Sequence, residues 1–222
     1  MISANVILRG DCTRLMDEVA PESVDFVLTD PPYLVAYRDR SGRTVANDDN
    51  DAWLLPSFRQ IRRVMKDSTL CVSFYGWHKV DVFFAAWRAA GLTPVGHIVF
   101  RKSYTSARRL LQYQHEQAYL LCKGPPPRTS EPIPDVIDFP YSGNTLHPTQ
   151  KPIEALEPLI HAFCPSAGIV LDPFCGSGST LLAAHNTGRR YIGIELDQAH
   201  HQTACLRLKD VAADFPVFGS AK

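Results

Sequence analysis

The chain has 222 residues, of which 45% are hydrophobic and 21% are charged. This length and apolar content suit one globular domain, residues 1–222, with enough chain for a sizeable core. Basic and acidic residues number 23 each, so the formal net charge is zero and a nucleic-acid partner has to be argued from local patches. No apolar run is long enough to cross a membrane and no leader-like segment begins the chain, which predicts a cytoplasmic protein.

The six cysteines are scattered along the chain, and no Cys-x-x-Cys pair occurs. We therefore expect reduced, mostly buried thiols rather than disulfides or a zinc site. The histidines also lack the spacing of metal ligands, so no metal ion is expected.

Short apolar runs alternate with amphipathic segments from one end of the chain to the other. This order predicts an α/β fold with a doubly wound, mostly parallel sheet, whose strands are apolar throughout because both faces are buried. The expected strands are residues 5–9, 24–29, 70–75, 94–100, 117–122, 168–171 and 191–195. The expected helices are residues 12–19, 53–65, 80–90, 152–163, 178–186 and 198–208.

Two segments lack this periodicity. Charged residues crowd residues 34–51, which predicts a mobile loop placed as a lid, although a plain surface loop explains the pattern equally well. Residues 123–148 are rich in proline and irregular, which predicts a connector.

Residues 101–116 form the best candidate for a nucleic-acid surface, a short target-recognition region. Cations surround an aromatic ring there, a composition that suits a flexible nucleic-acid strand. The candidate contacts are Arg101, Lys102, Tyr104, Arg108 and Arg109, together with Arg38 and Arg40 in the charged loop. A second basic stripe on the helix at 53–65 is more typical of a solvated face.

The apolar run 24–29 leads directly into Asp30-Pro31-Pro32-Tyr33. The residue before a proline is extended, so Asp30 leaves the strand without entering a helix. Two prolines then fix φ and remove two N–H donors, leaving a rigid corner of acceptors, the Asp30 carboxylate and the Pro31 carbonyl. Such acceptors can hold an amino group on a flat ring and release its lone pair for attack, while Tyr33 stacks on the ring. The bland alternative is a Pro-Pro turn capped by an aspartate.

A second stretch follows the apolar residues 169–171, where Asp172-Pro173-Phe174-Cys175-Gly176-Ser177-Gly178 opens a helix. This is a nucleotide-type turn, in which glycines let the backbone approach a ligand at a helix N-terminus. Glu195 ends the next strand about 20 residues later, where an acid takes the hydroxyls of a ribose. A third glycine is absent, and a ligand with a ribose and a carboxylate, such as S-adenosylmethionine (AdoMet), fits as well as a dinucleotide.

Four motifs together resemble the AdoMet-dependent DNA amino-methyltransferases of the β group. They are Asp30-Pro-Pro-Tyr33, His147-Pro-Thr-Gln-Lys-Pro152, Asp172-Pro-Phe-Cys-Gly-Ser-Gly178 and Tyr191-Ile-Gly-Ile-Glu195. The amine-binding motif precedes the cofactor loop, the permuted order of that group, and the resemblance covers roughly residues 4 to 210. It implies a Rossmann-like fold in which AdoMet is the cofactor and DNA the partner, with the target base drawn out of the stack.

The resemblance also implies roles for individual residues. The catalytic corner would be Asp30, Pro31, Pro32 and Tyr33. The cofactor would be held by Asp11 at its adenine, by Glu195 at its ribose, by Thr149 and Lys151 at its methionine end, and by the loop residues Asp172, Phe174, Gly176, Ser177 and Gly178.

In this family Asp-Pro-Pro-Tyr indicates adenine N6 as the target, whereas Ser-Pro-Pro-Tyr is commoner among cytosine-N4 enzymes. Cytosine N4 and an RNA substrate stay open as alternatives. A non-catalytic nucleic-acid-binding module is disfavoured by the intact motifs, and a nicotinamide-dependent oxidoreductase by the Asp-Pro-Pro-Tyr corner. Larger members carry an extra DNA-reading segment, so we expect a short or loosely enforced target, no dedicated restriction nuclease, and a homodimer as one way to add reading loops.

Overall fold

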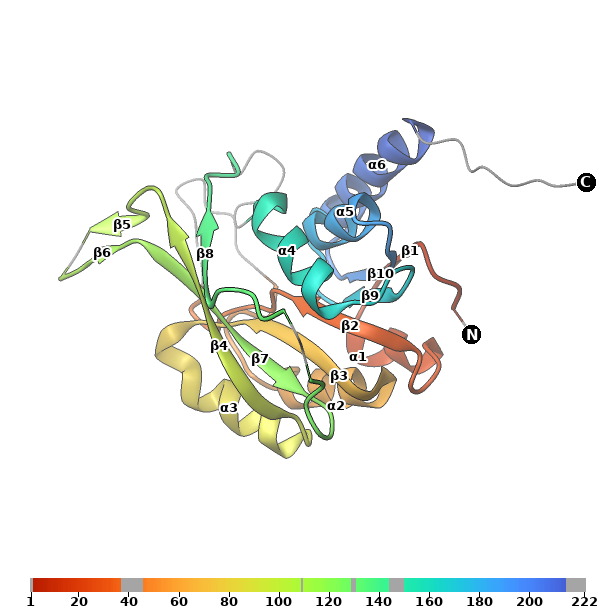
Figure 1. The fold of residues 1–222 in the computed structure, drawn as a ribbon, viewed down its shortest axis with the longest axis horizontal. Helices are drawn as coiled ribbons and strands as arrows, with labels where there is room; N and C mark the ends of the chain where they lie inside the picture. Colours follow the sequence, from red (N-terminus) through yellow and green to blue (C-terminus); the bar gives the residue numbers. More distant parts are fainter. Residues whose placement is uncertain (1, 37–45, 109, 129–130, 144–149, 215–222) are drawn as a thin grey trace, which may run out of the picture.

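The computed structural model describes residues 2–36, 46–108, 110–128, 131–143 and 150–214. An eight-stranded sheet lies at the centre, in the order β1-β10-β9-β2-β3-β7-β4-β8 (Figure 1). β7 is antiparallel to both of its neighbours, and the other strands run in one direction, which confirms the mostly parallel sheet. The strands are β1 (Val6–Arg9), β2 (Val24–Thr29), β3 (Met65–Phe74), β4 (Thr93–Lys102), β7 (His115–Cys122), β8 (Val136–Phe139), β9 (Ile169–Asp172) and β10 (Arg190–Glu195).

Helices cover both faces of this sheet (Figure 1). On one face lie α1 (Cys12–Leu15), α2 (Leu54–Val64) and α3 (Val80–Ala89), and on the other α4 (Ile153–Phe163), α5 (Ser179–Asn186) and α6 (Gln198–Asp214). Single 3-10 turns follow α1 at Met16–Glu18 and precede α3 at Trp77–Lys79. No helix in the described ranges has both the length and the apolar character needed to span a membrane.

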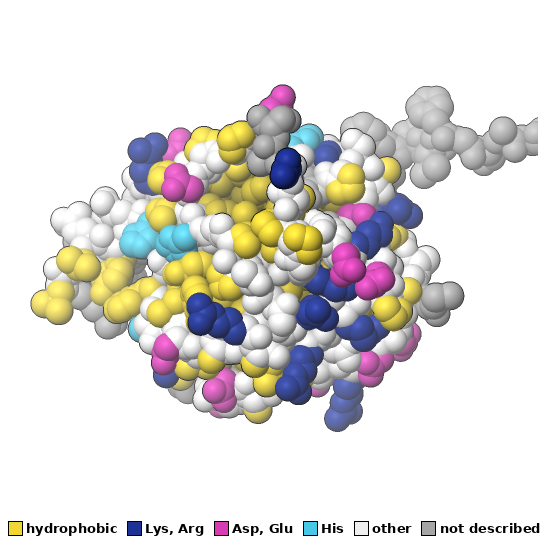
Figure 2. Space-filling view, turned by 60° about the horizontal axis from the view of Figure 1, so that its bottom comes forward, with side chains coloured by type: hydrophobic (Ala, Val, Ile, Leu, Met, Phe, Trp, Pro, Cys, Tyr) yellow, Lys and Arg dark blue, Asp and Glu magenta, His cyan; other side chains and the backbone are white. Residues whose placement is uncertain are grey.

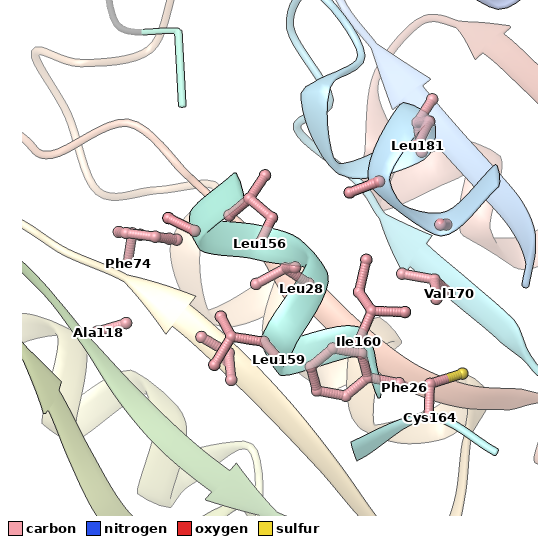
Figure 3. Packing of buried hydrophobic residues seen from close by; sticks show 14 of the residues in the cluster. Phe26, Leu28, Phe74, Ala118, Leu156, Leu159, Ile160, Cys164, Val170 and Leu181 are labelled. Carbon is pink, nitrogen blue, oxygen red and sulfur yellow. The ribbon is translucent and has the colours of Figure 1, made fainter. Parts of the chain in front are cut away.

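The central strand β2 shows why its sequence is apolar without alternation. Phe26 and Leu28 pack on the side of α4, whereas Val27 packs on the side of α2 and α3. Figure 3 shows Phe26 and Leu28 beside Leu159 and Ile160 of α4. Both faces of the strand are buried, so the residues in its middle, Phe26 to Leu28, are apolar without alternation. Buried Asp25 pairs with Lys66 at 2.5 Å.

The chain changes direction between β2 and β9, which are parallel neighbours. From β2 it passes through α2 to β3 on one side, and from β9 it passes through α5 to β10 on the other side and the opposite face. Open α/β sheets bind ligands at such a switch point, outside the carboxyl ends of the strands. Asp30 follows β2 there, and Asp172 ends β9.

Two parts of the fold differ from expectation. The connector predicted at 123–148 contains β8, which pairs in parallel with β4 at the edge of the sheet. Its four residues include Asp138 and are only partly buried, so they carry a weak strand signal. In addition, β5 (Ala107–Arg108) and β6 (Gln112–Tyr113) form a small hairpin between β4 and β7, where no strand was predicted.

Candidate active site

A cavity of about 290 Å³ lies at this switch point. Residues 10–12, 30–33, 46–48, 150–151, 172–177 and 195–197 contribute to its wall. The two predicted stretches therefore meet, because β2 and β9 lie side by side and their carboxyl ends face the same edge.

Asp30 is held by two donors. Its Oδ1 accepts a hydrogen bond from the Tyr33 hydroxyl at 2.8 Å, and its Oδ2 pairs with the Lys151 ammonium at 2.5 Å. Burial raises the pKa of Asp30, while the charge and hydrogen bond of Lys151 and the Tyr33 hydroxyl act in the opposite direction. Burial and the Asp30 carboxylate also raise the pKa of Tyr33, so its phenol stays protonated and donates.

The proline corner packs closely on the end of β3 through Gly76. A Cβ at this glycine would lie 2.7 Å from the Tyr33 carbonyl oxygen, closer than real Cβ atoms come. A side chain at Gly76 would therefore push the corner and its aspartate away. The sequence offers no signal for this role, because it depends on contact between distant segments.

The cofactor loop turns at Gly176, whose φ is 52°. Its N–H donates to Glu195 Oε2 at 2.8 Å, and the N–H of Asp197 donates to the other oxygen, Glu195 Oε1, at 2.7 Å. Glu195 thus connects the ends of β9 and β10 while facing the cavity. Asp172 is buried behind the loop, accepts from the Phe174 N–H at 3.1 Å, and has a pKa raised to about 7, chiefly by burial.

Two aromatic rings from different parts of the chain form another wall. Trp53 meets Phe174 edge-on with ring centroids 5.1 Å apart, and both rings line the cavity. The Trp53 indole N–H donates to the carbonyls of Asn47 and Asn50, which ties the end of the 34–51 segment to α2. The sequence showed Trp53 only as the expected start of a helix, so its place in the site was missed.

The charges of the cavity fit a cationic ligand. Lys151 is the one lysine or arginine among the described residues that line it. AdoMet carries a positive sulfonium, a positive ammonium and one carboxylate, so its net charge is positive, whereas a pyrophosphate would be repelled by this wall. The acidic lining residues are Asp11, Asp30, Asp48, Asp172, Glu195 and Asp197.

Several predicted cofactor residues take places that their motifs did not reveal. Asp11 lines the cavity and also caps α1, accepting from the Thr13 N–H and hydroxyl with one oxygen. Ser177 is buried in the wall. Gly178 is not part of the wall: it begins α5 with φ 82°, and a Cβ there would lie 3.1 Å from Ala204 of α6. Its glycine is needed for turn geometry and for helix packing.

The expected DNA-contact residues divide into two groups. Arg101 is exposed and pairs with exposed Asp138 at 2.7 Å. Lys102 corrects the prediction: its side chain is 6% exposed and pairs with Glu116 of β7, because strand alternation turns it inward. Tyr104 packs edge-on against Tyr141 with ring centroids 5.2 Å apart.

The hairpin projects from the carboxyl end of β4, the edge where the cavity opens, because β4 is parallel to β2. Hydrophobic side chains gather on this projection (Figure 2). Leu110 and Leu111 are exposed. The ring of Trp77 stacks on that of Tyr113, with centroids 6.4 Å apart. The described side chains of the hairpin thus include exposed apolar groups, which the sequence analysis did not single out.

Some of the predicted site residues are not among those that the structure describes. Thr149, Arg38, Arg40 and Arg109 lie outside the described residues, as does the side chain of Arg108. Of the expected loop at 34–51, the described ends are joined by the N–H of Leu34, which donates to Asp48 Oδ1 at 2.7 Å.

Comparisons with known proteins agree with this geometry. A family described as DNA methylase, the N6/N4 methyltransferases, matches residues 24–141 and 137–205. YubD of Escherichia coli (strain K12), a methylase by name, is 53% identical over 204 residues, covering 92% of this chain and 90% of its own. The type II methyltransferase M2.LlaDCHI of Lactococcus lactis subsp. cremoris is 26% identical over 91% of this chain and 88% of its own.

Solved structures show the same fold. The M1.HpyAVI–SAM complex matches with a TM-score of 0.73 at 24% identity, covering 91% of this chain and 98% of that one. The cytosine-N4-specific PvuII DNA methyltransferase matches with a TM-score of 0.75 at 15% identity, covering 99% and 89%. Because the family model matches most of the sequence and YubD is 53% identical to it, the chain belongs to the N6/N4 DNA methyltransferases, AdoMet-dependent enzymes that act on DNA.

Proposed function

We propose that this enzyme transfers the methyl group of AdoMet to the N6 amino group of adenine in DNA. The observation that carries the proposal is the position of the Asp30 carboxylate. It lies at the carboxyl end of β2 and lines the same cavity as the loop at Gly176. The Asp-Pro-Pro-Tyr corner is the form that the resemblance links to adenine rather than cytosine.

The residues of the corner suit an amine that must become nucleophilic. Each carboxylate oxygen of Asp30 has two acceptor positions, so the bonds to Tyr33 and Lys151 leave room for an N–H of the substrate. The Pro31 carbonyl offers a second acceptor. As the nitrogen attacks, it gains positive charge, and these fixed acceptors stabilise that charge more than they stabilise the neutral amine.

AdoMet supplies a methyl group already activated by its sulfonium. The carboxylates of the wall suit that positive charge, and Glu195 and Asp11 are placed to hold hydroxyl and amino donors. We assign to Tyr33 the positioning of Asp30 and one face of the base pocket.

Methylation of cytosine N4 is the second candidate. It is favoured by the fold match to a cytosine-N4-specific enzyme, which shows that this architecture can serve that base. An exocyclic amine on a smaller ring would use the same two acceptors.

The deciding experiment is direct. Purified protein is incubated with labelled AdoMet and unmodified duplex DNA, and the DNA is digested to nucleosides. We expect the label in N6-methyl-2′-deoxyadenosine. Label in N4-methyl-2′-deoxycytidine would replace adenine by cytosine in the proposal, and a parallel reaction with RNA tests the remaining alternative.

A further inference from the structure

Lys151 is in direct contact with the catalytic corner, although its motif suggested the methionine end of the cofactor. Its Nζ lies 2.5 Å from Asp30 Oδ2 and 3.3 Å from the Tyr33 hydroxyl. The same atom lies 4.8 Å from the ring centroid of Phe74 and 5.4 Å from that of Tyr33. Its side chain is only 9% exposed, so the ammonium is held in one place by a carboxylate, a phenol and two aromatic faces.

We propose that Lys151 is a positioning residue for Asp30, whose ammonium keeps the buried carboxylate ionised and fixed against Tyr33 so that it can receive the amine of the target base. This role rests on the proposed function, because it gives Lys151 a part in amine activation. It differs from a role in holding the cofactor, which would require the ammonium to face the methionine end.

The charges around Asp30 give this role a direction. Burial raises the pKa of Asp30, and Lys151 is the largest influence that lowers it, followed by the Tyr33 hydroxyl. The Glu116 carboxylate of β7 raises it, and Asp172 of β9 is a neighbouring acid whose own pKa is raised partly by Asp30. Without Lys151, only the Tyr33 hydroxyl opposes burial and the like charges, so the pKa of Asp30 rises further.

The expected sign follows. Activity requires ionised Asp30, so it is present above the pKa of that group and lost as the pH falls through it. In Lys151→Met the acidic limb of the pH–rate profile should move to higher pH, by about 1–3 units for the loss of an opposite charge at this distance. Turnover at neutral pH should fall with it, while affinity for AdoMet should stay within about twofold of wild type.

The test compares Lys151→Met with Lys151→Arg in methyl transfer to duplex DNA across the acidic and neutral range, and titrates AdoMet calorimetrically into both. Lys151→Arg should return the acidic limb towards wild type, because a cation is restored. Normal AdoMet binding also shows that a variant is folded. An unshifted limb with AdoMet affinity lowered tenfold or more would overturn the proposal and return Lys151 to the cofactor.

Lys123 provides a matched control. Its side chain is 6% exposed and, like that of Lys151, pairs with carboxylates, here Glu22 and Asp67. Lys123 follows β7, however, and so lies at the opposite edge of the sheet. Lys123→Met should lower stability without moving the acidic limb; a shift equal to that of Lys151→Met would also count against the proposal. Transfer to cytosine by the wild type would contradict the choice of adenine while leaving the test of Lys151 readable.

Discussion

At the scale of single residues, the site depends on where its carboxylates lie more than on how many there are. Asp30 follows β2 and Asp172 ends the neighbouring β9, and both line the cavity. The side chain of Asp30 is 21% exposed with two donors bound, whereas Asp172 is buried and accepts from the N–H of Phe174. The first therefore has acceptor capacity left for a substrate, and the second stabilises the turn.

Replacing Asp30 by alanine tests the first role. We expect Asp30→Ala to lower turnover by about two to three orders of magnitude, the usual scale for a lost transition-state partner. AdoMet binding should change little, because the proposed partner of Asp30 is the amine of the target base rather than the cofactor. Single-turnover methylation together with calorimetry measures both; near-normal turnover would remove Asp30 from the mechanism.

We expect Glu195, which lines the cavity, to bind the ribose of the cofactor. Glu195→Ala removes a charged acceptor, on the order of 1.5–3 kcal/mol, which is about 10- to 150-fold in AdoMet affinity. It also leaves the N–H groups of Gly176 and Asp197 without their carboxylate. Glu195→Gln keeps one acceptor oxygen and should lose less. An unchanged dissociation constant for Glu195→Ala would show that the acid does not meet the ribose.

The sequence predicted these residues because strand ends followed by proline or glycine have strong local signatures. It could not show that Lys151 meets Asp30, because these residues are 121 positions apart, and Lys151 lies just before α4, which packs against β2. Gly76 and Trp53 escaped for the same reason. Their roles are contacts between segments, and no local pattern records them.

At the scale of elements, the end of β4 and the hairpin beyond it decide which cations can reach DNA. Arg101 and Lys102 are sequence neighbours that point to opposite faces of β4. Arg101 joins an exposed pair, which is worth at most about 1 kcal/mol, and can exchange Asp138 for a phosphate. Lys102 has no such freedom.

This contrast predicts opposite outcomes for two matched variants. Arg101→Gln should leave stability nearly unchanged and flatten the salt dependence of DNA binding by about 0.9 in logarithmic slope, if the side chain meets one phosphate. Lys102→Gln should leave the slope alone but lower the free energy of unfolding by about 1–3 kcal/mol, because Glu116 loses its partner. Filter binding over a salt series measures the slope, and chemical denaturation measures the free energy of unfolding. Equal slopes for wild type and Arg101→Gln would show that Arg101 does not contact a phosphate.

Strands with strong apolar runs were predicted well, and the weak ones were not. β8 is a partly exposed edge strand in a proline-rich region, and β5 and β6 have two residues each. Such elements are formed by their neighbours rather than by their own composition. The reversed direction of β7 also escaped, because periodicity reports burial and carries no information on strand direction.

At the scale of the molecule, the size of the DNA-reading surface determines how strictly the enzyme can select a target sequence. Reading base pairs takes side chains at their edges in the major groove, each good pair giving about 1–3 kcal/mol. The described part of the 101–116 region is a short hairpin whose tip is apolar, with Gln112 and Gln114 as its amides. We propose a short or loosely enforced target, no dedicated nuclease, and a homodimer as a means of adding a second hairpin.

Methylation sequencing of DNA modified in a host without other methyltransferases tests this proposal. We expect methylation at several related short sites, graded in extent. A single fully methylated motif of five or more base pairs, with none elsewhere, would contradict it.

The pairing of β1 with β10 has a consequence for how the protein is made. Residues 6–9 lie in register with residues 192–195. Likewise, β2 can pair with β9 only after β9 has been synthesised. β1 therefore gains its neighbour only after the chain has been synthesised through β10. Pairings this distant close large loops and form late. A nascent chain stalled before β10 should bind no AdoMet, so binding of the cofactor would report that synthesis has passed β10.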